Sequence, residues 1–185
     1  CALPISLTGM LLDHLVQKTE TYPLTQEMRR TISMASVLHD IGKMEIGEQV
    51  LNSPEPRTPE DEEIMRQHTL LGARMLEELD AYRDEDFVRV AYQICRWHHE
   101  RYDGSGYPDQ LVGEQIPIAA QVVGLADAYE TLTTGSGSQP PVPCAAAVQM
   151  LCTGEAGAFN PVLLDCLREI ENEIDDAMRR RPETL

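Results

Sequence analysis

Six imidazole and carboxylate side chains in this sequence lie on the apolar faces of expected helices, or directly beside them. They are His39, Asp40, His68, His98, His99 and Asp127. Buried polar groups of this kind each need a partner, and one shared cation cluster would satisfy all of them at once. Helical bundles commonly build metal sites in this way, from side chains on facing helices. The spacing therefore predicts a single buried metal site.

Two doublets, His39-Asp40 and His98-His99, sharpen this prediction. Neighbouring residues on a helix point about 100° apart, so both members of a doublet can reach one centre, and Asp40 can bridge two metals. Six donors without cysteine are too many for a closed tetrahedral zinc site. Iron and manganese are the metals that we favour, while zinc and nickel also suit mixed imidazole and carboxylate donors. Paired metals about 3.5–4 Å apart are typical of hydrolysis at phosphorus, so we expect a dinuclear site.

Helices must position these side chains, and the hydrophobic periodicity predicts an all-α helical bundle. Helices are expected over residues 7–20, 25–40, 58–79, 84–99 and 118–132, with shorter ones near 145–151 and 161–178. Thr25 is a typical N-cap, and Pro59 after Thr58 is typical of a helix start. The apolar stripes that lead to the histidines and to Asp127 begin at Met28, Ile64, Phe87 and Ala120. Glycine and proline predict loops over residues 42–59 and 103–117, and a linker-like segment over residues 135–143.

Length and composition limit the class of protein. The 185 residues suit one domain over residues 1–185, and because the first residue is Cys1 we expect a fragment of a longer chain. The net charge of −16 argues against a DNA or RNA partner, since phosphate backbones are bound by Lys and Arg. The odd number of cysteines, without metal or redox spacing, favours reduced thiols and a cytoplasmic location. No apolar run is long enough for a membrane segment.

The order of the motifs resembles the HD-GYP family, a bacterial branch of the HD-domain metal-dependent phosphohydrolases. The matching segments are His39-Asp40-Ile41-Gly42-Lys43, His68, His98-His99-Glu100, Asp103-Gly104-Ser105-Gly106-Tyr107-Pro108 and Asp127. The resemblance implies an HD-domain bundle that hydrolyses cyclic di-GMP, a bacterial second messenger. Carried over by position, it makes the six donors metal ligands and Asp40 the bridging carboxylate. Lys43 would contact the phosphate and assist proton transfer.

The segment from Asp103 to Pro108 has two interpretations. Gly104, Gly106 and Pro108 permit a tight, stiff turn, or together with Tyr107 they shape one wall of the site. Glu100 and Asp103 are candidates for hydrogen bonds to the ligating imidazoles. Trinuclear members of the family take a further glutamate and a further histidine from the first helix. His14 lies two helical turns from the position of that histidine, so we leave it out of the site.

One motif of the family is missing. Members usually follow the last metal aspartate with Arg-Pro-Tyr-Arg or Arg-Pro-Tyr-Lys, whereas residues 134–141 here read Thr-Gly-Ser-Gly-Ser-Gln-Pro-Pro, and no Arg or Lys lies between Arg101 and Arg168. We favour a phosphodiesterase for cyclic di-GMP or a related cyclic dinucleotide in signal transduction. A catalytically degenerate sensor or interaction module, and a phosphohydrolase for another nucleotide, stay open. A fused regulatory domain and a homodimer are further expectations.

Overall fold

The computed structural model describes residues 3–53, 57–82, 85–135 and 140–179. Within these ranges the chain forms helices and no strand, which confirms the expected all-α class. The α-helices are α1 (Leu3–Lys18), α2 (Gln26–Ala35), α3 (Glu48–Leu51), α4 (Pro59–Arg66), α5 (His68–Glu77), α6 (Asp86–Trp97), α7 (Ile118–Thr134), α8 (Cys144–Thr153), α9 (Pro161–Glu169) and α10 (Glu171–Arg179). The 3₁₀ helices are η1 (Ser36–Leu38), η2 (Ile41–Glu45), η3 (Asp80–Tyr82) and η4 (Gly113–Gln115). None of these helices is long and apolar enough to cross a membrane.

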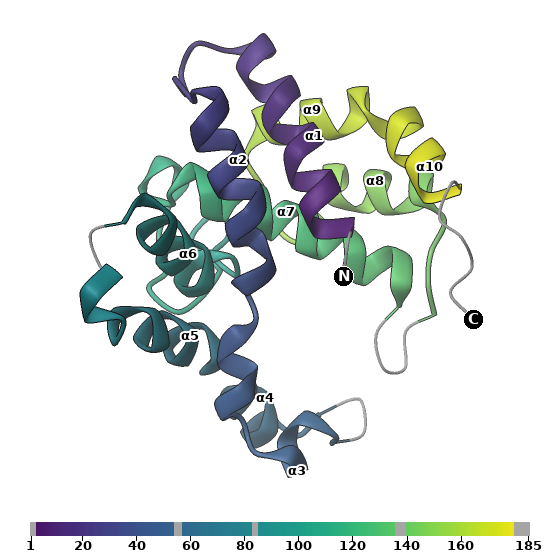
Figure 1. Cartoon of the computed structure of the whole chain (residues 1–185). Coiled ribbons are helices and arrows are strands. Elements are labelled where there is room, and N and C mark those ends of the chain that lie inside the picture. The colour runs from purple at the N-terminus through teal and green to yellow at the C-terminus, as the bar shows by residue number, and fades with distance from the viewer. Residues whose placement is uncertain (1–2, 54–56, 83–84, 136–139, 180–185) are drawn as a thin grey trace.

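Helix α7 occupies the middle of the molecule (Figure 1) and contacts α1, α6 and α8. Its residues are mostly apolar, and every residue from Ala119 to Ala126, the polar Gln121 included, is buried. Helices α2, α5 and α6 lie on one side of it in Figure 1, and α8, α9 and α10 lie on the other. Leu11 and Leu15 of α1 are fully buried in the same hydrophobic core. One hydrophobic core therefore supports the helices that carry the donors.

The second helix ends earlier than the sequence predicts. Thr25 is the expected N-cap, since its hydroxyl oxygen accepts the Met28 N–H at 3.2 Å. The α-helix stops at Ala35, however, and two 3₁₀ segments replace the predicted last turns up to Asp40. The hydroxyl of Ser36 donates to the Ser33 carbonyl at 2.7 Å, a local bond that competes with the helix ladder. His39 and Asp40 thus lie at a tightened turn between η1 and η2.

The predicted helix over residues 58–79 is two helices that meet at Gln67, and His68 begins the second. Similarly, the last predicted helix is divided at Ile170 into α9 and α10. The apolar period continues across both breaks, which is why the sequence alone did not locate them. Within the predicted loop over residues 42–59, the described part contains η2 and the short α3. Residues 136–139 of the linker-like segment lie outside the described residues.

Two glycines allow the donor-bearing segments to approach one another closely. A Cβ on Gly42 would lie 2.0 Å from the carbonyl oxygen of His68, so η2 packs directly on the start of α5. A Cβ on Gly124 would lie 2.3 Å from the carbonyl oxygen of His98, so α7 packs on the end of α6. Both distances are far below van der Waals contact. No other residue fits at either position without moving the backbone of a donor.

Candidate metal centre

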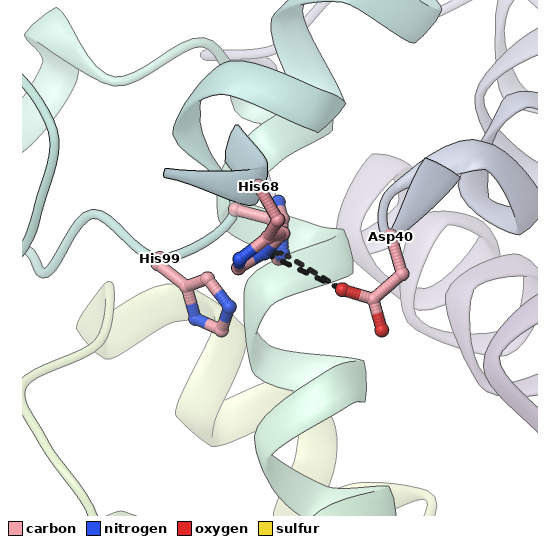
Figure 2. Close-up of side chains that lie close together, drawn as sticks. Asp40, His68 and His99 are labelled. Atoms are coloured by element: carbon pink, nitrogen blue, oxygen red, sulfur yellow. Dashed lines mark hydrogen bonds and ion pairs between the residues drawn. The ribbon is translucent and has the colours of Figure 1, made fainter. Parts of the chain in front are cut away.

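Four of the predicted donors converge on one point. Asp40, His68, His98 and His99 each offer a donor atom, and these atoms all lie within 4.8 Å of one another. Figure 2 shows His68 between Asp40 on one side and His99 on the other. His68 and His98 are buried, while Asp40 and His99 are partly exposed. The group therefore has an enclosed base and an accessible side.

The remaining two predicted donors lie beside the same carboxylate. His39 Nε2 is 3.3 Å from Asp40 Oδ2 and 3.5 Å from Asp127 Oδ1. The other oxygen, Asp40 Oδ1, is 3.4 Å from His68 Nε2. Asp40 thus presents one oxygen to each of two sets of donors, which is the arrangement expected of a bridging carboxylate. We call the six side chains together the donor cluster.

Backbone carbonyl groups fix the orientation of three imidazoles. The Nδ1 atoms of His39, His68 and His98 lie 2.8, 2.7 and 2.9 Å from the carbonyl oxygens of Ser36, Met65 and Ile94, respectively. A carbonyl oxygen only accepts, so each Nδ1 carries a proton and donates it. This leaves each Nε2, which points into the cluster, as the atom able to bind a metal ion.

The charges within the cluster favour a cation. Burial, together with nearby positive groups, lowers the pKa of His98 to about 3, and burial also lowers the pKa of His68 and His99. These three imidazoles are neutral at pH 7. Burial acts to raise the pKa of Asp40, but its hydrogen bonds and charge contacts with His39 and Lys43 outweigh this and hold the pKa well below its usual range.

His39 behaves differently from the other histidines. Burial opposes its charged form, yet the hydrogen bonds to Asp127 and Asp40 raise its pKa to about 10. Burial acts to raise the pKa of Asp127, but its hydrogen bond with His39 helps to keep this pKa low. Two carboxylates are therefore ionised here and share one imidazolium. A metal ion that binds to His39 Nε2 must displace that proton.

One buried carboxylate oxygen of the cluster has no hydrogen bond. Asp40 Oδ1 is buried and unpartnered, although it faces the Nε2 atoms of His68 and His98, the latter at 3.9 Å. Nε2 of each ring is the lone-pair atom, so these contacts are not hydrogen bonds. An unsatisfied buried carboxylate oxygen is costly, and a cation among these atoms would remove the cost. The donor types and this orphaned oxygen fit a divalent metal.

Lys43 lies at the accessible side of the cluster. Its Nζ donates to Asp40 Oδ2 at 2.6 Å, and its side chain is about two-fifths exposed. The turn of η2 places it three residues after Asp40, on the same side of the helix. The ammonium group can therefore contact both the carboxylate and a ligand that enters from solvent.

The segment from Asp103 to Pro108 packs against the cluster through Tyr107. The Tyr107 ring stacks on His99 with a centroid distance of 4.8 Å and an interplanar angle of 25°. Gly104 has a φ of +82°, and a Cβ on Gly106 would lie 2.3 Å from Arg101 N. The Tyr107-Pro108 peptide is cis. The two glycines therefore allow the tight turn. The turn in its folded conformation positions the Tyr107 ring against His99.

Glu100 and Asp103 differ from the sequence expectation, because both bind this loop and neither bonds to an imidazole. The buried Glu100 carboxylate accepts the backbone N–H groups of Asp109 at 2.7 Å and Leu111 at 3.1 Å. Asp103 is exposed and accepts from the backbone N–H and the hydroxyl of Ser105. The carbonyl groups described above hold the imidazoles instead. Burial raises the pKa of Glu100, although its backbone hydrogen bonds oppose this.

Two residues outside the predicted set, Asp109 and Arg66, also bear on the site, whereas His14 does not. His14 lies away from the cluster and contacts Glu173 at 3.6 Å, consistent with leaving it out. Asp109 accepts hydrogen bonds from Arg96 and from the Trp97 indole, which ties the loop to the end of α6. Arg66 lies over the Tyr107 ring, with Cζ 5.1 Å from its centroid. Sequence spacing gives no signal for Arg66, because its partner is 41 residues away along the chain.

Comparison with known proteins agrees with this geometry. A family model described as "HD domain" matches residues 8–162, so the chain belongs to the HD-domain family, and its motifs place it in the HD-GYP branch. The structure also resembles that of Bd1817, an HDG"Y"P protein from Bdellovibrio bacteriovorus. The TM-score is 0.65 at 23% identity, covering 91% of this chain and 51% of that one. That likeness supports the fold.

Curated bacterial relatives are more similar in sequence. The chain is 34% identical over 149 residues to a cyclic di-GMP phosphodiesterase of Thermotoga maritima, and 36% identical over 148 residues to the cyclic di-GMP phosphodiesterase response regulator RpfG of Xanthomonas campestris. It is 30% identical over 148 residues to 3′3′-cGAMP-specific phosphodiesterase 2 of Vibrio cholerae. Each match covers 80% of this chain but only 39%, 38% and 28% of the relative, respectively. The chain therefore spans less than half the length of these relatives.

Proposed function

We propose that this chain is a metal-dependent phosphodiesterase that hydrolyses cyclic di-GMP or a related cyclic dinucleotide in bacterial second-messenger signalling. The observation that carries the proposal is the position of Asp40, whose two oxygens face separate sets of imidazoles at 3.3 and 3.4 Å. The names of the relatives, which include phosphodiesterases for cyclic di-GMP and for 3′3′-cGAMP, supply the substrate class.

The donor cluster divides into two sets around the shared carboxylate. His39, Asp40 and Asp127 would hold one ion, and Asp40, His68, His98 and His99 would hold the second. Iron or manganese is the metal that we favour, with zinc or nickel compatible with the same donors. When bound, such ions lower the pKa of water and neutralise charge that develops on phosphoryl oxygens.

Lys43 is the protein group best placed to act on the phosphodiester. Hydrolysis forms a bond from a water oxygen, which loses a proton, to phosphorus and breaks the bond from phosphorus to the ribose oxygen, which gains a proton. The ammonium group beside Asp40 can donate a hydrogen bond to a non-bridging phosphoryl oxygen and can supply that proton. Its bond to Asp40 keeps it oriented towards the cluster. Lys43 and Asp40 are therefore the residues proposed to be catalytic.

Metal analysis combined with a hydrolysis assay tests this function. Protein loaded with iron or manganese should contain about two metal ions per chain and should convert cyclic di-GMP into the linear dinucleotide or GMP. His39→Ala should abolish turnover, while His14→Ala, which changes a histidine outside the cluster, should retain it. A fully metallated protein that leaves cyclic di-GMP, 3′3′-cGAMP and other nucleotides intact would contradict the proposal.

A second function, a degenerate sensor or interaction module, is favoured by one observation. No Arg or Lys lies between Arg101 and Arg168, in the region where the family usually carries a basic segment. Part of that region, residues 136–139, lies outside the described residues. Such a module would bind metal and a nucleotide or a protein without turnover, so calorimetry would detect binding where the assay detects no product.

The setting of the domain is a further proposal. We propose that residues 1–185 form a single HD-GYP-like domain that is fused to a regulatory domain in a longer protein. The length of the relatives and the response-regulator name of one of them support this. A homodimer and a cytoplasmic location stay predictions from the sequence. Purification of the full-length protein, with and without the proposed regulatory domain, would test whether that domain changes the rate of hydrolysis.

A further inference from the structure

A cyclic dinucleotide carries two phosphodiesters, and the donor cluster can act on only one of them at a time. Lys43 lies against Asp40, so it serves the phosphodiester that occupies the cluster. The second negative charge then needs another partner. The chain has a net charge of −16, so an isolated anion near its surface is repelled unless a local cation binds it.

Arg66 is placed to be that cation. It is the last residue of α4, and its guanidinium lies over the Tyr107 ring, which stacks on His99. Two ring contacts of 5.1 and 4.8 Å place the guanidinium within about 10 Å of the His99 ring, comparable with the Debye length of ~10 Å at 0.1 M salt. Lys43 contacts Asp40, on the other side of His68 from His99 in Figure 2. The two cations therefore flank the cluster.

The guanidinium of Arg66 is free to bind an anion. Arg66 is exposed, and an arginine over a ring face keeps its N–H groups available at the edges of the plane. Its ion pair with Glu62 measures 3.7 Å between Nε and Oε1, too long for a hydrogen bond. Exposed pairs of this kind contribute little, so a phosphate can replace Glu62.

Arg101, the other arginine near the site, is held differently. Its guanidinium donates to the Glu100 carbonyl oxygen at 3.1 Å and lies over the Phe159 ring at 4.8 Å. A Cβ on Gly157 would lie 2.7 Å from Arg101 Nε, which shows how closely the chain covers this side chain. The chain thus covers most of Arg101, whereas Arg66 is exposed.

We propose that Arg66 is a substrate-binding residue that contacts the phosphodiester of a cyclic dinucleotide that is not being cleaved. Tyr107 is the platform that keeps its guanidinium beside the site. This inference rests on the proposed function and deepens it. It assigns to α4 the positive charge that the family usually supplies after the last metal aspartate.

The test compares Arg66→Gln and Arg66→Lys with wild-type metal-loaded protein. Binding is measured by calorimetry with a non-hydrolysable phosphorothioate analogue of cyclic di-GMP, and turnover is measured with cyclic di-GMP itself. Arg66→Gln should weaken binding and raise KM by about tenfold or more, the loss expected for one charge-assisted hydrogen bond, with a smaller change in kcat. Arg66→Lys should recover part of the affinity, because it restores the charge without the planar group.

A second substrate separates binding of the distant phosphodiester from damage to the site. Bis(p-nitrophenyl) phosphate has one phosphodiester, so the loss of kcat/KM caused by Arg66→Gln should be about tenfold smaller for it than for cyclic di-GMP. Arg74→Gln is the matched control, since Arg74 is also exposed and pairs with a glutamate four residues away, Glu78, at 3.2 Å. Glu62→Gln should have the opposite sign and tighten binding.

Each outcome decides between the inference and the function beneath it. If wild-type protein cleaves cyclic di-GMP and Arg66→Gln binds the analogue as tightly as wild type, the inference fails and the proposed function stands. Equal losses on both substrates would also overturn it, because they indicate damage to the cluster. If wild type binds the analogue without cleaving cyclic di-GMP, the proposed function fails. The affinities of wild type and Arg66→Gln for the analogue then still decide whether Arg66 binds the phosphodiester.

Discussion

On the buried side of the metal centre, the imidazoles of His68 and His98 are enclosed, and backbone carbonyl groups hold them. On the rim, which we define as Lys43, Arg66 and Tyr107, two partly or fully exposed cations each have one carboxylate neighbour. The enclosed imidazoles are held in one orientation, whereas the cations of the rim can exchange their carboxylate neighbours for a ligand. We infer that the buried side determines the chemistry and the rim determines which phosphate ester is bound. The predictions below test that division.

The largest effect is expected at the carboxylate that joins the two sides. Asp40→Asn keeps the shape of the side chain but removes the charge shared by both sets of donors. Loss of a group that only supports a metal ligand lowers metal affinity or activity by about 10–100-fold. Loss of the ligand Asp40 itself should therefore lower kcat by more than about 100-fold. Metal content per chain should fall in the same protein. Asp13→Asn, which weakens the ion pair between the exposed Asp13 and the partly buried Arg29, is the control and should change neither quantity.

The next effect tests whether the buried side depends on close backbone contact. Gly42→Ala places a methyl group 2.0 Å from the His68 carbonyl oxygen, so the free energy of unfolding should fall by about 3 kcal/mol, at the upper end of overpacking costs. Metal affinity should fall as well, since His68 must shift. Urea unfolding measures the change in the free energy of unfolding, and metal titration measures the change in metal affinity. Gly47→Ala, in the same segment with no atom within 4 Å, should be silent, and equal effects at both positions would refute the argument.

The pH dependence of the metal-stripped protein tests the charges of the buried side. Between the pKa of about 3 for folded His98 and its ordinary value of 6.5, the unfolded chain binds a proton there that the folded chain does not. Stability should therefore fall as the pH decreases through this window, by on the order of 2 kcal/mol at pH 5 from His98 alone. His39, with a raised pKa of about 10, stabilises the fold below pH 6.5 and loses that effect as the pH rises to 10.

A maximum near neutral pH is the expected result for urea unfolding of the chelator-treated protein. A flat profile from pH 5 to pH 7 would mean that the enclosed histidines titrate normally. The imidazoles of the buried side would then be accessible to water.

The same division explains what the sequence predicted. The six donors are recognisable because their types recur at short, ordered spacings, and the all-α class follows from the apolar period. Met28, Ile64 and Phe87, the first residues of three predicted apolar stripes, are exposed, so these stripes are buried only further along the chain. The breaks after Ala35 and at Gln67 leave the apolar period intact, so periodicity did not reveal them.

Contacts on the rim were less accessible to sequence reasoning. Arg66 meets Tyr107 only because α4 and the loop after α6 fold together, and no local pattern links residues 41 positions apart. The partners of the imidazole Nδ1 atoms are backbone carbonyls, which every residue has, so residue types give no information about them. From the sequence, Glu100 and Asp103 are candidates for that role, but the carboxylates of both accept hydrogen bonds within the loop instead.

The smallest effect is expected at Glu100, and it most directly separates the two sides. Glu100→Gln removes a buried charge that accepts two backbone N–H groups. The amide nitrogen of glutamine is itself a donor, so it would oppose one of these two N–H groups without forming a hydrogen bond. Unfolding free energy should fall by about 1–2 kcal/mol. The loop that carries Tyr107 should loosen, so KM for cyclic di-GMP should rise several-fold.

Metal content should stay at the wild-type value in Glu100→Gln, because the imidazoles take their orientation from carbonyl groups elsewhere. Asp103→Asn is the control, since that exposed side chain bonds only within its own turn. If Glu100→Gln lost metal in proportion to activity, the loop would be part of the donor scaffold. The rim could then no longer be treated as a separate determinant of the substrate, because a change in loop geometry would alter the chemistry as well.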